Sequence, residues 1–196
     1  MPKIVDHNKQ KEKLAEATWR VILRDGLERA SVRNIALEAG ISAGSMRHYF
    51  STQSELLAFS MRLVSQRVKT RISSIQYTGE LMEDIQQLLC EILPMDEERS
   101  AEMEVWFGFT AKALVDPTLH GLCSEVYDEL RRVISSVMEA LGKSDLLREG
   151  LDFEIETERL YAVIDGLAVH AVVMPSRLNP EMIRSVIAAH LRSLCK

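Results

Sequence analysis

The side chains best suited to binding another molecule gather in one short stretch, SAGSMRHY at residues 42–49. Its arginine, histidine, tyrosine and serine side chains offer hydrogen-bond donors, the groups that bind phosphate oxygens and base edges in a DNA major groove. The small residues Ala43 and Gly44 let a helix approach a surface closely, while Met46 and Phe50 are spaced to anchor its opposite face. The stretch predicts a DNA-contacting helix; the alternative is a solvated helix with no binding role.

A turn must hold this helix against an earlier one. The preceding apolar residues have the i, i+3, i+4, i+7 spacing of one helix face: Val32, Ile35, Ala36 and Ala39. Ser31 precedes them as an N-cap, and Gly40 follows them, where a helix end favours glycine. Ser42 caps the next helix, with Ile41 and Met46 spaced as a hydrophobic staple. Two short helices joined by so tight a turn predict a helix-turn-helix.

Further helix signals complete a small N-terminal bundle. Residues 9–25 carry an apolar stripe that ends at Gly26 and consists of Leu14, Thr18, Val21 and Ile22. Thr52 and Glu55 have the spacing of a capping box at the start of the next helix. We therefore expect a helix-turn-helix domain of three helices over residues 1–60, with a disordered arm at about residues 1–8.

The charge is divided unevenly along the chain. The net charge is −5, yet residues 1–72 hold 13 Lys and Arg against 7 Asp and Glu, and the remainder holds 11 against 22. A basic N-terminal part beside an acidic remainder favours nucleic acid as the partner of the first part. The four lysines near the start either add phosphate contacts or belong to a solvated terminus: Lys3, Lys9, Lys11 and Lys13.

Composition argues against several other classes. Cys90, Cys123 and Cys195 form no C-x-x-C pair, so we expect reduced thiols and neither a disulfide framework nor a metal site. No catalytic or phosphate-loop motif occurs, which predicts a protein that is not an enzyme and needs no cofactor. The apolar run 160–174 is too short to span a membrane and contains Asp165, and the charged start is unlike a signal peptide, so we expect a cytoplasmic protein.

Beyond residue 72 the sequence predicts helices throughout, with restarts at Asp116-Pro117 and Asn179-Pro180. The fold class is thus all-α, with residues 61–196 forming a larger helical domain for effector binding and dimerisation. An apolar cavity with a few polar groups suits a small molecule. The candidate lining residues, each of which can equally be ordinary core, are Met103, Trp106, Phe109, Tyr127, Met138 and His170.

The helix expected at 154–174 is apolar nearly all round and must be covered on two sides. One side can face its own domain, and the other needs a partner, as does a similar stripe on the last helix. Two such helices from each of two chains predict a four-helix interface with two-fold symmetry. Its candidate residues are Ile164, Gly166, Leu167, Ile183, Val186 and Ile187.

The stretch SVRNIALEAGISAGSMRHYF resembles the DNA-binding signature of the TetR family of one-component transcriptional regulators. The resemblance implies that the helix from about Ser42 to Phe50 is the recognition helix of a homodimer. It places Ser31, Arg33, Ser42 and Tyr49 at phosphate-facing positions, and it places at base-facing positions Ala43, Gly44, Ser45 and His48. Two residues depart from the family pattern. Arg47 stands where Tyr is common and adds a base or phosphate contact, whereas Gln53 replaces a common phosphate-binding Lys.

The segments EVWFGFTAKALVDPTL and RLYAVIDGLAVHAVV resemble the C-terminal regions of the betaine-pathway repressor subgroup of that family. The implied function is a homodimeric repressor that binds a pseudo-palindromic operator in double-stranded DNA and is released by a small-molecule effector of unknown identity. The alternatives are a DNA-binding dimer without an effector and a transcriptional activator.

Overall fold

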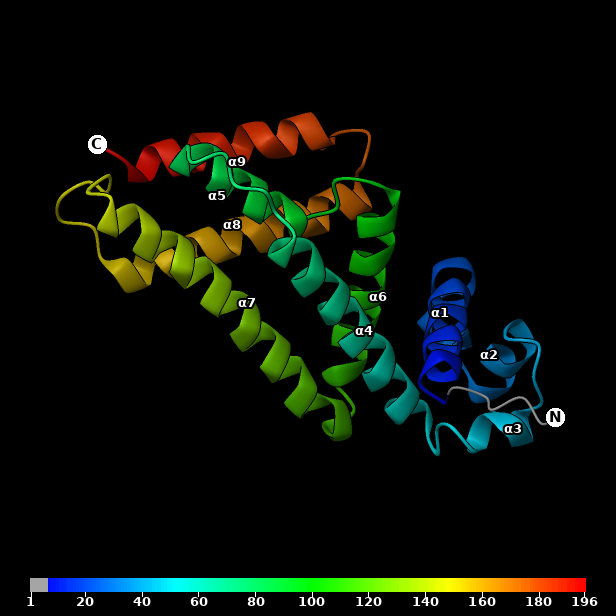
Figure 1. Cartoon of the computed structure of the whole chain (residues 1–196). Coiled ribbons are helices and arrows are strands. Elements are labelled where there is room, and N and C mark those ends of the chain that lie inside the picture. Colours follow the sequence, from blue (N-terminus) through cyan, green and yellow to red (C-terminus); the bar gives the residue numbers. More distant parts are fainter. Residues whose placement is uncertain (1–6) are drawn as a thin grey trace. The chain divides into compact units, whose positions relative to one another are not determined.

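The computed structural model describes residues 7–196, and within that range it is helical throughout (Figure 1). Its one extended pairing there is an isolated bridge between Leu147 and Cys195. The all-α prediction is confirmed. The elements are α1 (His7–Asp25), the 3₁₀ helix η1 (Leu27–Arg29), α2 (Val32–Glu38), α3 (Ala43–Arg47), α4 (Gln53–Ser73), α5 (Leu81–Glu91), α6 (Glu97–Ala113), α7 (Pro117–Lys143), α8 (Phe153–Val173) and α9 (Pro180–Leu194).

The chain packs as two compact units. The first holds the residues up to Arg67 together with Glu104–Cys123, and the second holds Val68–Met103 together with Ser124–Lys196. Helices α4, α6 and α7 each contribute residues to both units. The boundary predicted at residues 60 and 61 stays a prediction, but the second half of α6 and the first turns of α7 pack with the N-terminal helices.

Helix α1 buries the stripe expected from the sequence: Leu14, Thr18, Val21 and Ile22. Thr18 is polar, and its buried hydroxyl is satisfied by a 2.8 Å hydrogen bond that it donates to the Leu14 carbonyl. The helix already begins at His7, whereas the predicted arm extended to about residue 8. Lys3 and the rest of residues 1–6 lie outside the described residues.

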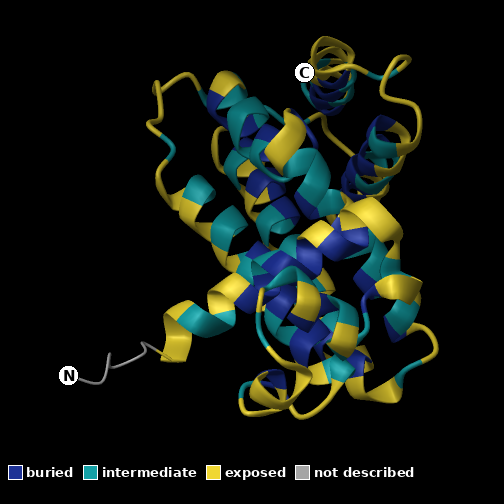
Figure 2. Cartoon of the chain, turned by 90° about the vertical axis from the view of Figure 1, so that its right-hand side faces the viewer, coloured by how far each residue is buried: buried dark blue, intermediate teal, exposed yellow. Residues whose placement is uncertain are grey.

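Helices α8 and α9 of the second unit begin at side-chain N-caps. The Asn179 side chain accepts a 2.9 Å hydrogen bond from the Met182 amide, with Pro180 at the first helical position, as the Asn-Pro signal predicts. Asp152 caps α8 in the same way, through the amides of Glu154 and Ile155. Helix α9 packs on α5. Helices α8 and α9 are each buried along one side and exposed along the other (Figure 2).

No helix within residues 7–196 is long and apolar enough to cross a membrane.

Candidate nucleic-acid interface

Two side-chain caps shape the helix-turn-helix. Ser31 Oγ accepts a 3.2 Å hydrogen bond from the Asn34 amide at the start of α2, and Ser42 Oγ accepts a 3.0 Å bond from the Ser45 amide at the start of α3. Between the two helices Gly40 has a φ of 69°, a left-handed conformation in which a side chain would be strained. The predicted caps and turn are therefore present.

Helix α3 is anchored on one side and open on the other. Met46 and Phe50 are almost completely buried. The remaining side chains expected to face bases or phosphates are exposed, except for the half-buried Tyr49: Ser42, Ala43, Gly44, Ser45, Arg47 and His48. The helix ends at Arg47 with His48 as its C-cap, so it is shorter than the predicted span to Phe50. A compact row of donors thus faces outward from a buried anchor.

Gly44 is not required by the chain itself. A Cβ at this position would meet Ser42 Oγ alone, at 3.6 Å, which is ordinary van der Waals contact. Its backbone also lies outside the left-handed region, because its φ is not among the positive values. The fold therefore gives no reason for glycine at this position, and its predicted role in close approach to DNA stays a prediction.

Two aromatic contacts restrain the edges of this surface. The His7 ring lies 4.8 Å from the Tyr49 ring, centroid to centroid, at an interplanar angle of 37°. Lys11 Nζ lies over the Phe50 and Phe59 rings, at 5.3 and 5.8 Å from their centroids. This cation–π packing leaves Lys11 half-buried. Lys11, one of the four lysines considered as phosphate contacts, thus packs against the rings of its own chain.

Near the start of α2, two of the residues expected to bear on phosphate binding make contacts within the chain instead. Arg33 is exposed, whereas the half-buried Ser31 uses its hydroxyl to cap α2. Gln53 was expected only as the loss of a phosphate anchor, yet its Nε2 donates a 2.7 Å hydrogen bond to the Ala30 carbonyl. These residues are 23 positions apart, and no local pattern in the sequence signals the contact.

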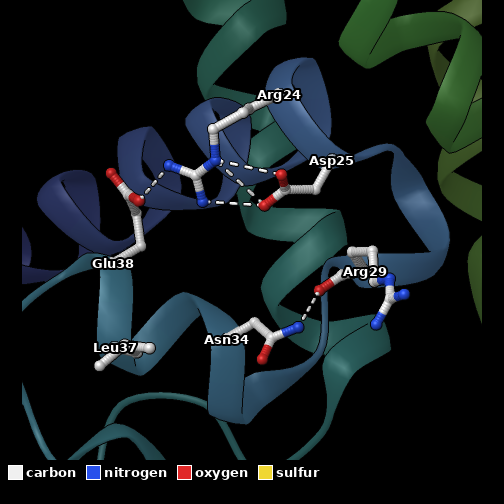
Figure 3. A pocket seen from close by; sticks show the side chains of 6 residues that line it. All are labelled: Arg24, Asp25, Arg29, Asn34, Leu37 and Glu38. Carbon is white, nitrogen blue, oxygen red and sulfur yellow. Dashed lines mark hydrogen bonds and ion pairs between the residues drawn. The ribbon is translucent and has the colours of Figure 1, made fainter.

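Beside α2 lies an open surface hollow of about 630 Å³, lined by Arg24, Asp25, Arg29, Asn34, Leu37 and Glu38 (Figure 3). Arg24 lies between Asp25 and Glu38 and donates hydrogen bonds to both carboxylates. Hydrogen bonds from Arg20 and then Arg24 hold the pKa of Glu38 below its usual range. The charges at this hollow are thus largely paired with one another, and none of the predicted effector-pocket residues lines it.

The predicted pocket residues divide between the two units. In the first unit Trp106 and Phe109 stack with ring centroids 6.0 Å apart, and Phe109 is buried. In the second unit Met138 is fully buried, and the Tyr127 carbonyl accepts a 3.3 Å hydrogen bond from the Tyr161 hydroxyl. Met103 is half-buried and His170 is exposed on α8. Their role in binding an effector stays a prediction.

The predicted dimer residues also have different environments. Ile164, Leu167, Ile183 and Ile187 are buried within the chain, which leaves Gly166 and Val186 half-exposed. Large apolar side chains are exposed elsewhere on α8, at its C-cap and on α9: Ile155, Val169, Val173, Met174 and Met182. Helices α8 and α9 thus each expose apolar side chains, but the helical period could not tell which of their faces packs internally, and the dimer interface stays a prediction.

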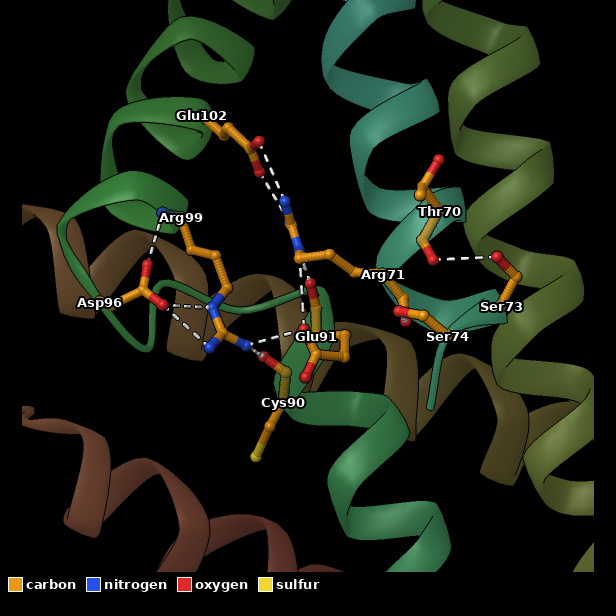
Figure 4. Close-up of polar contacts among 9 residues, drawn as sticks. All are labelled: Thr70, Arg71, Ser73, Ser74, Cys90, Glu91, Asp96, Arg99 and Glu102. Carbon is orange, nitrogen blue, oxygen red and sulfur yellow. Dashed lines mark hydrogen bonds and ion pairs between the residues drawn. The ribbon is translucent and has the colours of Figure 1, made fainter. Parts of the chain in front are cut away.

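A charged cluster that the sequence did not reveal lies in the second unit (Figure 4). Arg71 of α4 donates to both Glu102 oxygens of α6, at 3.0 and 2.7 Å, and Arg99 lies 2.9 Å from both Glu91 and Asp96. Burial alone would lower the pKa of Arg71, but its hydrogen bonds to Glu102 raise it. The cluster joins the end of α4 to α5 and α6.

Comparisons with known proteins agree with this geometry. Residues 14–59 match the family model described as "Bacterial regulatory proteins, tetR family", and residues 82–196 match "BetI-type transcriptional repressor, C-terminal". The chain is 48% identical to HTH-type transcriptional regulator PksA of Bacillus subtilis, over all of this chain and 94% of that protein. It is 30% identical to HTH-type transcriptional regulator BetI of Proteus mirabilis, over 85% and 82% of the two chains.

Solved structures show the same fold. A transcriptional regulator from Rhodococcus sp. Rha1 superposes with a TM-score of 0.83 at 30% identity, covering 94% of this chain and 95% of that one. A putative transcriptional regulator from Saccharomonospora viridis, solved in complex with choline, superposes with a TM-score of 0.82 at 20% identity, covering 96% and 99% of the two chains. At that identity the second similarity shows the fold alone.

Proposed function

Because the chain belongs to the TetR family of transcriptional regulators, we propose that it is a homodimeric repressor that binds a pseudo-palindromic operator and is released by a small molecule. The single observation that carries the DNA-binding step is the outward row of donors on α3, held by the buried Met46 and Phe50. Arg47 and His48 have the chemistry to bind guanine edges or phosphates, and Gly44 allows close approach.

The dimer is supported by the apolar surface on α8 and α9. Ile155 and Val173 are 63% and 65% exposed in the single chain, and Val169 lies between them on α8. Leaving such a row in water is unfavourable, and burying it against the same row of a second copy gives a closed two-fold interface. A two-fold dimer brings two recognition helices to successive major grooves about 34 Å apart.

The release step is supported by the match of residues 82–196 to a repressor C-terminal model. A small molecule that binds better to a conformation with wrongly spaced recognition helices lowers operator affinity by the coupling free energy between the two sites. That coupling is typically ~1–3 kcal/mol, or roughly 5- to 150-fold in affinity. The chemistry of the effector is left open by this proposal.

Fluorescence anisotropy tests the DNA-binding step. The labelled probe is the DNA immediately upstream of the protein's own gene, measured near physiological salt against an excess of an unrelated duplex. Binding that resists the competitor supports a sequence-specific operator and provides the signal for a small-molecule screen. If the competitor abolishes binding here and no duplex is enriched from a random-sequence pool, the proposed function is wrong.

A further inference from the structure

The first turn of α4 is held from two directions by adjacent residues. Gln53 Nε2 donates a 2.7 Å hydrogen bond to the Ala30 carbonyl, and Ser54 Oγ donates a 2.6 Å hydrogen bond to Asp116 Oδ2. Both contacts are partly buried, and both lie inside the first unit. One reaches the segment that enters α2, and the other reaches the corner between α6 and α7.

On the α2 side, two side-chain amides fix consecutive carbonyls. Asn34 Nδ2 donates a 3.0 Å hydrogen bond to the Arg29 carbonyl, next to the Ala30 carbonyl that Gln53 holds. Ala30 is fully buried and immediately precedes Ser31, the N-cap of α2. The hydrogen bond from Gln53 therefore fixes the backbone at the start of α2. It thereby also fixes the position of the exposed Arg33 in the first turn of that helix.

On the other side, Asp116 is shared between two helices. Its Oδ2 accepts from Ser54, while its Oδ1 accepts hydrogen bonds from the Thr118 amide and hydroxyl at 3.1 and 2.6 Å. The carboxylate thus caps the start of α7 while it binds the start of α4. A shift of the α6–α7 corner must either carry the first turn of α4 with it or break a hydrogen bond to a charged acceptor.

We propose that Gln53, Ser54 and Asp116 are positioning residues for DNA binding, which together register the start of α2 against the α6–α7 corner. This inference rests on the proposed function. None of the three side chains needs to touch DNA. Their role is to keep Ser31, Arg33 and the following helix α3 in the arrangement that fits the operator, so that losing them lowers operator affinity in a chain that remains folded.

The test uses the full-length protein and a duplex that the wild type selects from a random-sequence pool. We expect Gln53→Ala and Ser54→Ala to weaken binding roughly 3- to 10-fold, the effect of losing one hydrogen bond. Gln86→Ala and Ser73→Ala are matched controls, because Gln86 Nε2 also donates to a distant carbonyl, that of Arg184, and the Ser73 hydroxyl bonds the Thr70 carbonyl of its own helix. Both controls should bind as the wild type does.

Three readouts separate positioning from other roles. The slope of log K against log salt should fall by up to about 0.9 in Gln53→Ala, because a displaced Arg33 no longer neutralises its phosphate, whereas losing a direct contact from the neutral Gln53 side chain would leave the slope unchanged. Ser54→Thr, which keeps the hydroxyl, should restore most of the affinity. Ser54→Ala and Asp116→Ala remove the same hydrogen bond, so their losses in affinity should not add. The double variant Ser54→Ala/Asp116→Ala should therefore bind with the affinity of whichever single variant binds more weakly.

The outcomes are distinct. Variants that bind the selected duplex as tightly as the wild type, while the wild type itself is specific, overturn the positioning role and leave the proposed function intact. Weakened binding with an unchanged salt slope in Gln53→Ala, or additive losses in the double variant, overturns it as well. If the wild type selects no duplex at all, the proposed function and the positioning role fall together.

Discussion

The Arg71 guanidinium lies 2.7 Å from the carboxylate of Glu102, whose side chain is only 5% exposed. Arg71 also lies 3.5 Å from Glu91, so the end of α4 is tied to α5 and α6 within one unit. A buried carboxylate of this kind is tolerated because its partner is charged and hydrogen-bonded. Removing one member leaves the other partly buried without full compensation.

Glu102→Gln should therefore destabilise the protein. We expect a loss of about 2 kcal/mol in the free energy of unfolding, below the range for fully buried pairs because Arg71 is a quarter exposed. Urea unfolding at pH 7 measures it. The matched control is Glu129→Gln, which breaks the exposed pair with Lys69 and should cost less than about 1 kcal/mol. Equal losses in the two variants would contradict this account.

Arg47→Ala should weaken operator binding without unfolding the domain. Arg47 is exposed and is not part of the buried anchor formed by Met46 and Phe50, so we expect the melting temperature to stay within a degree or two. We expect operator affinity to fall roughly 10-fold, the typical loss for one direct contact. Anisotropy titrations at several salt concentrations would distinguish a phosphate contact, which lowers the salt slope, from a base contact, which relaxes sequence preference.

Arg132→Ala is the control for this variant, since Arg132 is an exposed arginine of α7 whose guanidinium donates a hydrogen bond to the Asp128 carbonyl of its own helix. It should bind the operator normally. If Arg47→Ala also binds normally, Arg47 is not part of the DNA surface.

Gly44→Ala should separate stability from binding. The added methyl has room inside the chain, and alanine is a better helix former, so the free energy of unfolding should be unchanged or raised by up to about 1 kcal/mol. Operator affinity should nevertheless fall at least several-fold, because the methyl occupies the surface that approaches the groove. Gly121→Ala on α7, where a Cβ meets nothing within 4 Å, should keep full affinity. Full affinity in Gly44→Ala would show that α3 does not enter the groove at that point.

Val169→Glu should convert the proposed dimer to a monomer. The change places a charge in the middle of the exposed apolar row of α8, where dimer formation would bury it without a partner. Sedimentation velocity at micromolar concentration should show the shift in mass, and far-ultraviolet circular dichroism should remain helical. Val115→Glu adds the same charge at another exposed valine and should not change the mass. A dimeric Val169→Glu variant would place the interface elsewhere.

Local signals predicted the geometry of the helix-turn-helix well. The caps Ser31 and Ser42 act within three residues of their own positions, and Met46 and Phe50 follow the helical period, so sequence spacing was sufficient to predict all four. Which exposed residues face DNA is implied by the family resemblance alone and stays a prediction, because burial and caps do not assign that role.

Contacts between residues far apart in the chain could not be predicted from the sequence. Ser54 and Asp116 are 62 positions apart, and Gln53 reaches a backbone carbonyl, which has no sequence signature at all. The same difficulty affected α8, where Ile164 and Val169 are equally apolar in the sequence, but the first is buried inside the chain and the second is exposed. Which face of such a helix packs internally depends on the tertiary arrangement of its neighbours.

Asp165→Asn should stabilise the protein in a pH-dependent way. Burial raises the pKa of the Asp165 carboxyl above its ordinary value, so the folded chain holds this proton more tightly than the unfolded chain does. Stability from this group is therefore fully present below the ordinary aspartate pKa of about 4 and is lost as the pH rises through the raised value.

An amide carries no charge at any of these pH values. The variant should consequently melt at a higher temperature than the wild type at pH 7, and the difference should vanish near pH 4. Asp128→Asn, at an exposed position of α7, is the control and should melt within a degree or two of the wild type at pH 7. A pH-independent difference for Asp165→Asn would mean that it arises from packing and not from the charge.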